Sequence, residues 1–250
     1  MTAQLKGIAL GATCAALLAG SAVAGPPYLT DDPQPTDEGH WEIYDFATGA
    51  NDPSGLGGEA GLDLNYGAAK DLQLTAVLPL AYENENGFST RGLRAGAGAI
   101  ELAAKEKIVH ADDKSWVPDV SLFPRLFAPT DRRYGTGHVG LLLPAWAEKD
   151  FGPWQVFGGG GYQINPGADQ RNFWQGGIAM NRPVSERLQL GVELFGQTRE
   201  AVDGPGYAAV NFGATLKLAE HWALLASAGP TWEQNGARGQ VFYLALNADY

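Results

Sequence analysis

Residues that could act as acids, bases, nucleophiles or metal ligands are few in this sequence. The chain has four histidines, and no two of them stand at a metal-ligand spacing: His40, His110, His138 and His221. A membrane-embedded hydrolase would need a serine next to a histidine. The candidate serines fall on other predicted strands or turns: Ser121, Ser185 and Ser227. We therefore predict no catalytic residue, no metal site and no cofactor.

Four consecutive glycines, Gly158–Gly161, resemble part of a phosphate-binding loop. The run lacks the Lys-Ser/Thr pair that follows in such a loop, and no strand-to-helix transition surrounds it. Glycine within a β-strand instead relieves crowding against neighbouring side chains. We expect a strand here, with an aromatic side chain of an adjacent strand filling the space that the glycines leave.

An acidic, proline-rich segment, residues 25–39, precedes the first predicted strand. Its carboxylates do not have the spacing of a calcium-binding loop: Asp31, Asp32, Asp37 and Glu38. Two placements are open for this segment. It is either a solvated lead-in on the periplasmic side or a plug that folds into a barrel lumen and restricts it. Its prolines would stiffen such a plug.

The composition excludes one class of function and favours one class of fold. The formal charge of the 250-residue chain is −11 at pH 7, and no run of lysine or arginine occurs, which argues against nucleic-acid binding. Charged residues make up only 18%, while glycine is abundant at 34 residues. Such a composition suits a β-protein with tight turns and large side chains on a pleated surface.

The first 24 residues have the three parts of a secretory signal peptide. Lys6 provides the positive start, residues 7–20 are apolar and small, and residues 22–24 form an A-x-A cleavage site. The apolar stretch is shorter than the ~20 residues that a membrane-spanning helix needs. Cleavage would remove Cys14, the single cysteine, so we expect neither a disulfide nor a thiol catalyst in the exported chain.

Period-two alternation recurs along the rest of the chain and predicts strands with two different faces. Phe212 and Ala214, for example, alternate with Asn211 and Gly213. We predict twelve strands: 40–47, 59–66, 72–82, 93–108, 117–128, 138–148, 154–164, 172–182, 188–198, 207–218, 222–230 and 240–250. Most have the length of roughly 9–11 residues with which a tilted strand crosses a bilayer.

The connections alternate between long and short along the chain. Long segments rich in Gly, Pro, Asn and Asp lie at 48–58, 83–92, 129–137, 165–171, 199–206 and 231–239. Shorter ones lie at 67–71, 149–153, 183–187 and 219–221, with 109–116 somewhat longer. Outer-membrane barrels have short periplasmic turns, longer outside loops and an even number of strands. We therefore predict an all-β fold, a single transmembrane antiparallel up-and-down barrel over residues 40–250, with both termini periplasmic.

Aromatic residues near the predicted strand ends would form the interfacial belts of such a barrel. They are Trp41, Tyr66, Tyr82, Trp146, Trp154, Tyr162, Trp174, Tyr207, Trp222 and Trp232. The last strand ends on Tyr250, with apolar residues at every second position before it. This pattern resembles the terminal strand by which outer-membrane barrels are recognised for assembly. We expect the barrel-assembly machinery, outer-membrane lipid and lipopolysaccharide as partners.

If the alternating apolar side chains face lipid, their polar neighbours face the lumen. The predicted lumen-lining residues are Asp63, Asn65, Gln73, Thr75, Glu101, Lys105, Asp119, Arg125, Gln189, Glu193, Gln197, Asn211 and Lys217. Charges of both signs on this face would pair with each other across a narrow lumen or line a water path. A twelve-stranded barrel should be wider inside than an eight-stranded one and narrower than a porin.

Several motifs, in order along nearly the whole exported chain, are similar to those of one family. They are Pro26-Pro27-Tyr28-Leu29-Thr30-Asp31-Asp32-Pro33, Gly39-His40-Trp41-Glu42, Asn65-Tyr66-Gly67, Asp71-Leu72-Gln73-Leu74, Ile100-Glu101-Leu102, Lys149-Asp150-Phe151-Gly152-Pro153-Trp154 and Tyr162-Gln163-Ile164-Asn165-Pro166-Gly167. The sequence thus resembles the outer-membrane proteins of the MetA-pathway of phenol degradation family. That resemblance implies a barrel of the outer membrane with a transport or channel role for small compounds, aromatic ones among them, and brings no catalytic residues.

Glu106 departs from this family's pattern, in which an aromatic residue follows Lys105. The departure puts an acid on the predicted outer face. Two explanations are open: Glu106 lies near the membrane interface, or the strand register shifts there.

Together these features predict an exported outer-membrane protein through which small molecules pass. The lumen would be narrow or gated, its charges would set selectivity, and residues 25–39 or the long loops would set access. The alternatives are a non-transporting structural barrel and a lipid-modifying barrel enzyme. A soluble secreted β-protein is a third alternative, which the strand lengths and loop alternation disfavour.

Overall fold

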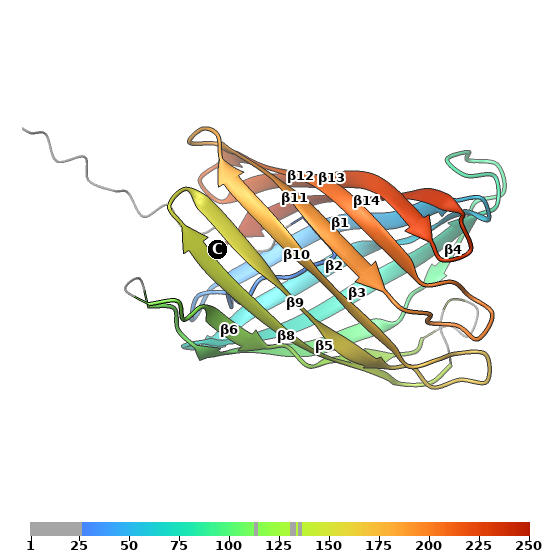
Figure 1. Cartoon of the computed structure of the whole chain (residues 1–250), viewed down its shortest axis with the longest axis horizontal. Helices are drawn as coiled ribbons and strands as arrows, with labels where there is room; N and C mark the ends of the chain where they lie inside the picture. The colour runs from blue at the N-terminus through green and yellow to red at the C-terminus, as the bar shows by residue number, and fades with distance from the viewer. Residues whose placement is uncertain (1–26, 113–114, 131–133, 135–136) are drawn as a thin grey trace, which may run out of the picture.

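The structure is a computed structural model that describes residues 27–112, 115–130, 134 and 137–250. The predicted signal peptide, residues 1–24, and Cys14 lie outside these residues. Strands dominate the described chain, and it contains no helix long and apolar enough to cross a membrane. The strands tilt together around one closed wall (Figure 1).

Fourteen strand segments form this wall. They are β1 (Trp41–Asp52), β2 (Gly55–Ala69), β3 (Leu72–Asn84), β4 (Arg94–Ala97), β5 (Ile100–Val109), β6 (Asp119–Leu122), β7 (Arg125–Ala128), β8 (Gly140–Phe151), β9 (Trp154–Ile164), β10 (Phe173–Pro183), β11 (Leu188–Gln197), β12 (Tyr207–Ala219), β13 (Trp222–Glu233) and β14 (Arg238–Asp249). All pairings between them are antiparallel.

The fourteen segments make twelve crossings, because β4 with β5 and β6 with β7 each form one interrupted strand. Proline explains both interruptions, since it has no backbone N–H to give to a neighbouring strand. Pro124 separates β6 from β7, and Gly98, between β4 and β5, donates to the carbonyl of Pro79 at 2.9 Å. Pairing of β1 with β14 and of β5 with β3 closes the wall. The predicted twelve-stranded antiparallel barrel is confirmed.

The two faces of the wall have inverted polarity relative to a soluble protein. Leu102 and Leu244 are about half exposed on the outside, at 52% and 50%. Glu101 and Gln73 are each 5% exposed and lie inside. Strands in two stacked sheets would bury the leucines instead. The distribution therefore fits an apolar surface that meets hydrocarbon and an interior lined by polar groups.

Two ends of the barrel are distinguished by their connections. At the turn end lie the short turns 70–71, 152–153 and 220–221. The start of the first strand and the end of the last strand also lie there, where Trp41 and Tyr250 exchange backbone hydrogen bonds of 2.7 and 2.9 Å. At the loop end lie the longer connections that follow β3, β7, β9 and β11. For these four connections the sorting of long and short follows the prediction.

Two of the predicted long loops are wrong. Residues 48–58 are mostly strand, since β1 and β2 are separated only by residues 53–54, and 231–239 shrinks to residues 234–237. The first region contains Gly49 and Gly58, which signal a loop in the sequence. In the structure their lack of side chains lets the Tyr82 ring lie across them and donate a 3.0 Å hydrogen bond to the carbonyl of Thr48.

Two aromatic residues predicted for the interfacial belts face inward instead. Trp146 is 2% exposed and packs over Gly159, its paired residue on β9, with a ring carbon 3.0 Å from where a Cβ would lie. The expectation that an adjacent aromatic side chain fills the space left by the glycine run is thereby confirmed for Gly159. Tyr207 lines the interior near the loop end. Both faces of a strand accept aromatic residues, so position along the strand did not reveal the side.

Replacing Leu244, at the middle of β14, with Arg should destabilise the barrel by about 2–4 kcal/mol, because the charge would face the bilayer midplane. Leu218→Arg, on the same outer surface beside the turn end, should cost only about 0–1 kcal/mol. Urea titration of protein refolded in liposomes measures both. Equal costs for the two variants would contradict a membrane-spanning wall.

Candidate functional site

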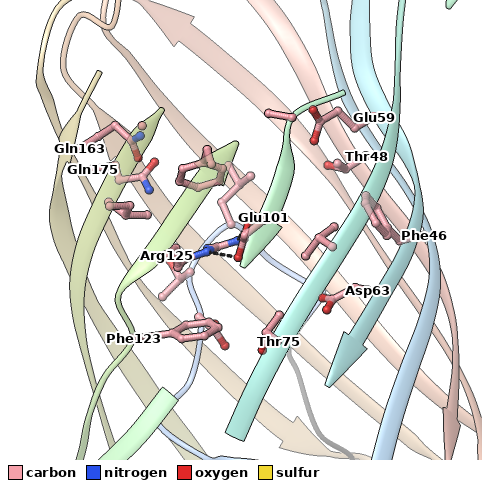
Figure 2. A pocket seen from close by; sticks show the side chains of 18 of the residues that line it. Phe46, Thr48, Glu59, Asp63, Thr75, Glu101, Phe123, Arg125, Gln163 and Gln175 are labelled. Atoms are coloured by element: carbon pink, nitrogen blue, oxygen red, sulfur yellow. Dashed lines mark hydrogen bonds and ion pairs between the residues drawn. The ribbon is translucent and has the colours of Figure 1, made fainter. Parts of the chain in front are cut away.

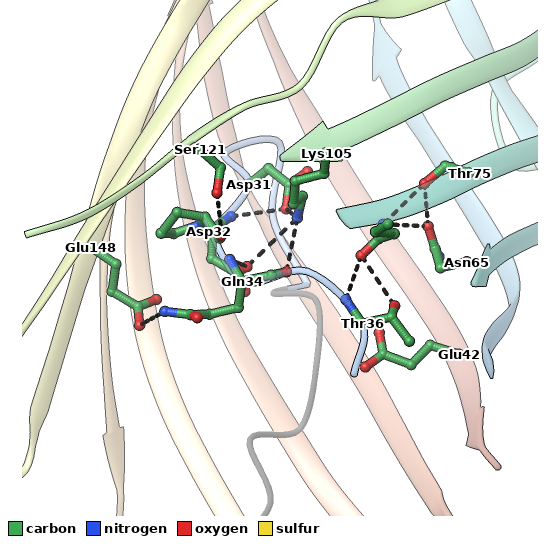
Figure 3. Close-up of polar contacts among 12 residues, drawn as sticks. Asp31, Asp32, Gln34, Thr36, Glu42, Asn65, Thr75, Lys105, Ser121 and Glu148 are labelled. Atoms are coloured by element: carbon green, nitrogen blue, oxygen red, sulfur yellow. Dashed lines mark hydrogen bonds and ion pairs between the residues drawn. The ribbon is translucent and has the colours of Figure 1, made fainter. Parts of the chain in front are cut away.

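Residues 27–39, here called the luminal segment, lie inside the barrel before β1 begins. The segment passes the wall at Gly67, whose carbonyl accepts a 2.8 Å hydrogen bond from the Gly39 N–H. A Cβ on Gly67 would lie 1.9 Å from the carbonyl oxygen of Asp37. Glycine is therefore required for the chain to pass so close to β2. Of the two placements considered for residues 25–39, the described residues occupy the lumen (Figure 3).

Lys105 on β5 is the main electrostatic anchor of the luminal segment. Its Nζ lies 3.1 Å from Asp31 and 3.7 Å from Asp32, and only 5% of the lysine side chain is exposed. It also donates to the carbonyl of Gln34 at 3.4 Å. Burial raises the pKa of Asp32, and the positive charge of Lys105 acts against that rise. Each partner thus compensates the buried charge of the other.

Gln34 extends the anchorage toward β6 and β8. Its amide donates to Asp119 at 3.0 Å and to Glu148 at 2.9 Å, and its amide oxygen accepts from Lys107. The adjacent Pro33 carbonyl accepts a hydrogen bond from the buried Ser121 hydroxyl. Figure 3 shows Ser121 and Glu148 both in contact with the segment near Gln34.

Thr36 joins the segment to β2 and β3. Its N–H and hydroxyl both donate to the Gln73 amide oxygen, at 2.8 and 3.1 Å. Gln73 in turn donates to Asn65 at 2.7 Å and to Thr75 at 2.9 Å. This network satisfies the polar groups of a buried position, as buried amides require.

The opposite wall holds the other part of the segment. Glu193 on β11 is fully buried and accepts hydrogen bonds from the Thr30 N–H and the Asn211 amide. The Tyr28 ring lies against Gly191 and Gly213, which are paired residues of β11 and β12. The segment therefore touches the wall on both sides of the lumen.

Above the luminal segment, toward the loop end, lies a cavity of about 750 Å³. Its floor includes Tyr28, Thr30 and Asp31. On one side the Arg125 guanidinium makes two hydrogen bonds to Glu101, of 2.6 and 2.8 Å (Figure 2). The volume is within the usual range for sites that bind small molecules, roughly 300–1,000 Å³.

The wall of the cavity has a polar arc and an aromatic arc. The polar arc runs over β2 to β7 and includes the Glu101–Arg125 pair, with Phe123 beneath both cations at 4.9 Å from Lys105 and 5.4 Å from Arg125. The aromatic arc runs over β10 to β14 and β1. It consists of Phe173, Phe195, Tyr207, Tyr243 and Phe46. A solute in the cavity would meet charge on one side and rings on the other.

The structure brings most of the predicted lumen-lining residues to these two regions. Those that line the cavity are Asp63, Asn65, Gln73, Thr75, Glu101, Lys105, Arg125 and Gln197. Those that contact the luminal segment or its buried partners are Asp119, Glu193 and Asn211. Gln189 lies near the turn end and donates to Gln155 at 3.1 Å.

Lys217 does not belong with this set. It is exposed beside the turn at 220–221, next to a register shift between Lys217 and Ala219, and it lines no part of the cavity. Its partner Ala223 is buried in the interior, so the alternation holds as far as Lys217, and Lys217 is exposed because it lies at the end of the strand.

Aromatic lining residues were missed because apolar side chains were assumed to face lipid. Phe46 and Phe195 are 9% and 7% exposed and point inward. A signal existed on β1, where Glu42, Phe46 and Thr48 share one parity. Polar residues on both sides of an aromatic residue at period two indicate that the whole row faces the lumen.

The candidate groups for catalysis have other contacts in the structure. The Ser121 hydroxyl donates to Pro33, His110 lies 2.9 Å from Asp71, and the His221 ring stacks on Tyr250 at 5.7 Å. Over the described ranges, no group of three or more His, Asp or Glu side chains is arranged to hold a metal ion.

Comparison with solved structures finds a close likeness in fold. The COG4313 outer membrane channel from Pseudomonas putida F1 superposes with a TM-score of 0.67 at 16% identity, over 87% of this chain and 97% of that chain. This chain has the fold of that channel. The resemblance to the MetA-pathway of phenol degradation family is thereby confirmed at the level of the fold.

Other likenesses are weaker. The outer membrane channel DcaP of Acinetobacter baumannii gives a TM-score of 0.36 at 9% identity, over 87% of this chain and all of that chain. An anion-selective porin from Comamonas acidovorans gives 0.37 at 10% identity, over 84% of this chain and 98% of that one. No protein-family model matches the chain, and no curated protein matches it.

Lys105→Met should release the luminal segment, because Asp31 and Asp32 would remain buried without a cation, at a cost of about 3–5 kcal/mol. Faster amide hydrogen exchange over residues 30–36 is the expected readout. Lys70→Met, at the exposed turn 70–71, is the matched control and should leave exchange unchanged. Unchanged exchange in Lys105→Met would show that the ion pairs do not hold the segment.

Proposed function

We propose that this protein is a narrow, gated channel of the bacterial outer membrane for small molecules, apolar or aromatic compounds among them. The observation that carries the proposal is a solute-sized cavity inside a closed barrel, with the luminal segment as its floor. A barrel with only a structural role needs no such cavity. The likeness in fold to an outer membrane channel supports the same proposal.

Access in this proposal is controlled by the luminal segment. Its contacts are hydrogen bonds and ion pairs to side chains of the wall, and no disulfide is available after residue 14. Such contacts can be exchanged for contacts with water or solute at modest net cost, since a typical hydrogen bond contributes about 0.5–1.5 kcal/mol. The segment can therefore be stable in place and still be displaced.

The cavity wall sets selectivity. In the aromatic arc, Phe173, Phe195 and Tyr243 would contact the flat apolar groups of a solute. In the polar arc, the Glu101–Arg125 pair would stay hydrated. A small aromatic compound would satisfy the rings by stacking while its polar substituents remain hydrated.

Export, orientation and assembly complete the proposal. Signal-directed export would be followed by recognition of the C-terminal strand, β14 with Tyr250, by the barrel-assembly machinery. The turn end would face the periplasm. Outward aromatic residues near the two ends, such as Trp222 at 39% and Trp174 at 62% exposure, would contact lipid and lipopolysaccharide.

A lipid-modifying barrel enzyme receives no specific support. Such an enzyme needs a nucleophile on the outer surface within reach of lipid. Ser121 is fully buried under the luminal segment, and the Ser185 hydroxyl accepts hydrogen bonds from the N–H groups of Arg187 and Leu188 in a turn.

Purified protein should conduct ions weakly in planar bilayers and admit small solutes in liposome-swelling assays. Lys105→Met should increase single-channel conductance several-fold, because the released segment widens the path, and Lys70→Met should not. Absence of both current and swelling, in the wild type and in Lys105→Met, would remove the channel proposal and favour the structural barrel.

A further inference from the structure

The polar arc of the cavity carries more negative than positive charge. Among the described lining residues, six are carboxylates and two are Lys or Arg. Both of these cations are already engaged: Arg125 with Glu101, and Lys105 with Asp31 and Asp32 of the luminal segment. No lysine or arginine of the cavity lining is therefore left to neutralise the excess carboxylates.

Four lining carboxylates are in no ion pair, Glu42, Glu59, Asp63 and Glu200, and two of these, Asp63 and Glu59, lie on the same strand, β2. No Lys, Arg or His in the described part of the chain lies within ion-pair distance of either one. Asp63 accepts one hydrogen bond of 2.9 Å, from Asn65. Both line the cavity, and Figure 2 shows them on the same side of it.

Aromatic rings stand next to these two carboxylates. Inward positions on β2 alternate as Glu59, Gly61 and Asp63, and Gly61 is paired with Phe46 of β1. This pairing puts Phe46 at the level between the two carboxylates (Figure 2). Tyr243 of β14 follows beside Thr48, the partner of Glu59.

Two unpartnered amides line the cavity from β9 and β10. Gln163 is only 8% exposed, yet its side chain makes no hydrogen bond with any described residue, and neither does that of Gln175. Figure 2 places both across the pocket from Phe46 and Glu59. Gln175 is only half-buried, but Gln163 is a buried amide without a partner, which is costly, so Gln163 indicates a polar ligand or water in the cavity. This observation is independent of the carboxylates.

We infer that the cavity is a binding site for small organic cations, in which an ammonium group meets Asp63 and Glu59 while an attached ring packs on Phe46 and Tyr243. The amides of Gln163 and Gln175 would accept or donate hydrogen bonds to polar substituents. Opposite charge and an aromatic face both attract an ammonium group. The inference rests on the proposed channel function and specifies its substrate class.

Three probes of similar shape test the inference: 2-phenylethylammonium, 2-phenylethanol and phenylacetate. Binding is measured by isothermal titration calorimetry on the detergent-solubilised exported chain. The ammonium probe should bind at least about tenfold more tightly than the alcohol, and phenylacetate should bind most weakly. Equal affinity for the ammonium and the alcohol, or tighter binding of phenylacetate, would overturn the inference.

Asp63→Asn and Glu59→Gln should each weaken the ammonium probe about fivefold and leave the alcohol unchanged. The matched control is Glu83→Gln, a carboxylate on the rim that pairs with Arg94 outside the cavity. A heat-modifiable gel shift confirms that each variant is folded. If folded Asp63→Asn and Glu59→Gln both bind the ammonium probe as the wild type does, the site is not where we place it.

Transport and binding can fail separately. Calorimetric binding of 2-phenylethylammonium without current or swelling would reject the channel and keep the site. Current and swelling with no preference for the ammonium probe would keep the channel and reject the site.

Discussion

Closure of the hydrogen-bonded wall is the constraint on which the rest of this structure depends. Hydrocarbon offers no partner to a backbone N–H or carbonyl, so each strand needs a neighbour on both sides. The pairing of β1 with β14, and of β5 with β3 across the proline interruptions, meets that need. Once the wall is closed, its outer surface must be apolar and its inner surface can be polar. Buried charges such as Lys105 and Glu193 become possible only because the interior is wet and filled with partners.

Much of the fold could be predicted because it follows from patterns among residues that are close together in the sequence. Alternation at period two revealed the crossings, and it placed Glu106 correctly on the outside. Glu106 pairs with Leu72 and Leu122 beside the turn at 70–71, and the register of β5 with β6 shifts only after it, between Lys107 and Val109. Glycine-rich strand ends were mistaken for loops, since a glycine gives the same local signal in a turn and under a covering ring. Tyr82 over Gly58 shows the second case.

The candidate site was only half predictable. Its charges and amides stand out in alternating strands, and Glu101, Arg125 and Lys105 lie where the pattern put them. The aromatic arc could not be separated from lipid-facing residues, because a phenyl ring is favourable on either side of a strand. The contacts of residues 27–39 were beyond reach, because they join positions far apart in sequence, such as Thr30 with Glu193.

The luminal segment also has a mechanical consequence. It spans the bore from Lys105 and Gln73 on one side to Glu193 and Asn211 on the other, so it acts as a transverse brace as well as an obstruction. Whatever unblocks the passage also removes this brace and lets the cross-section of the cylinder deform. Permeability and rigidity are thus opposed in this molecule, because both are set by the same few polar contacts.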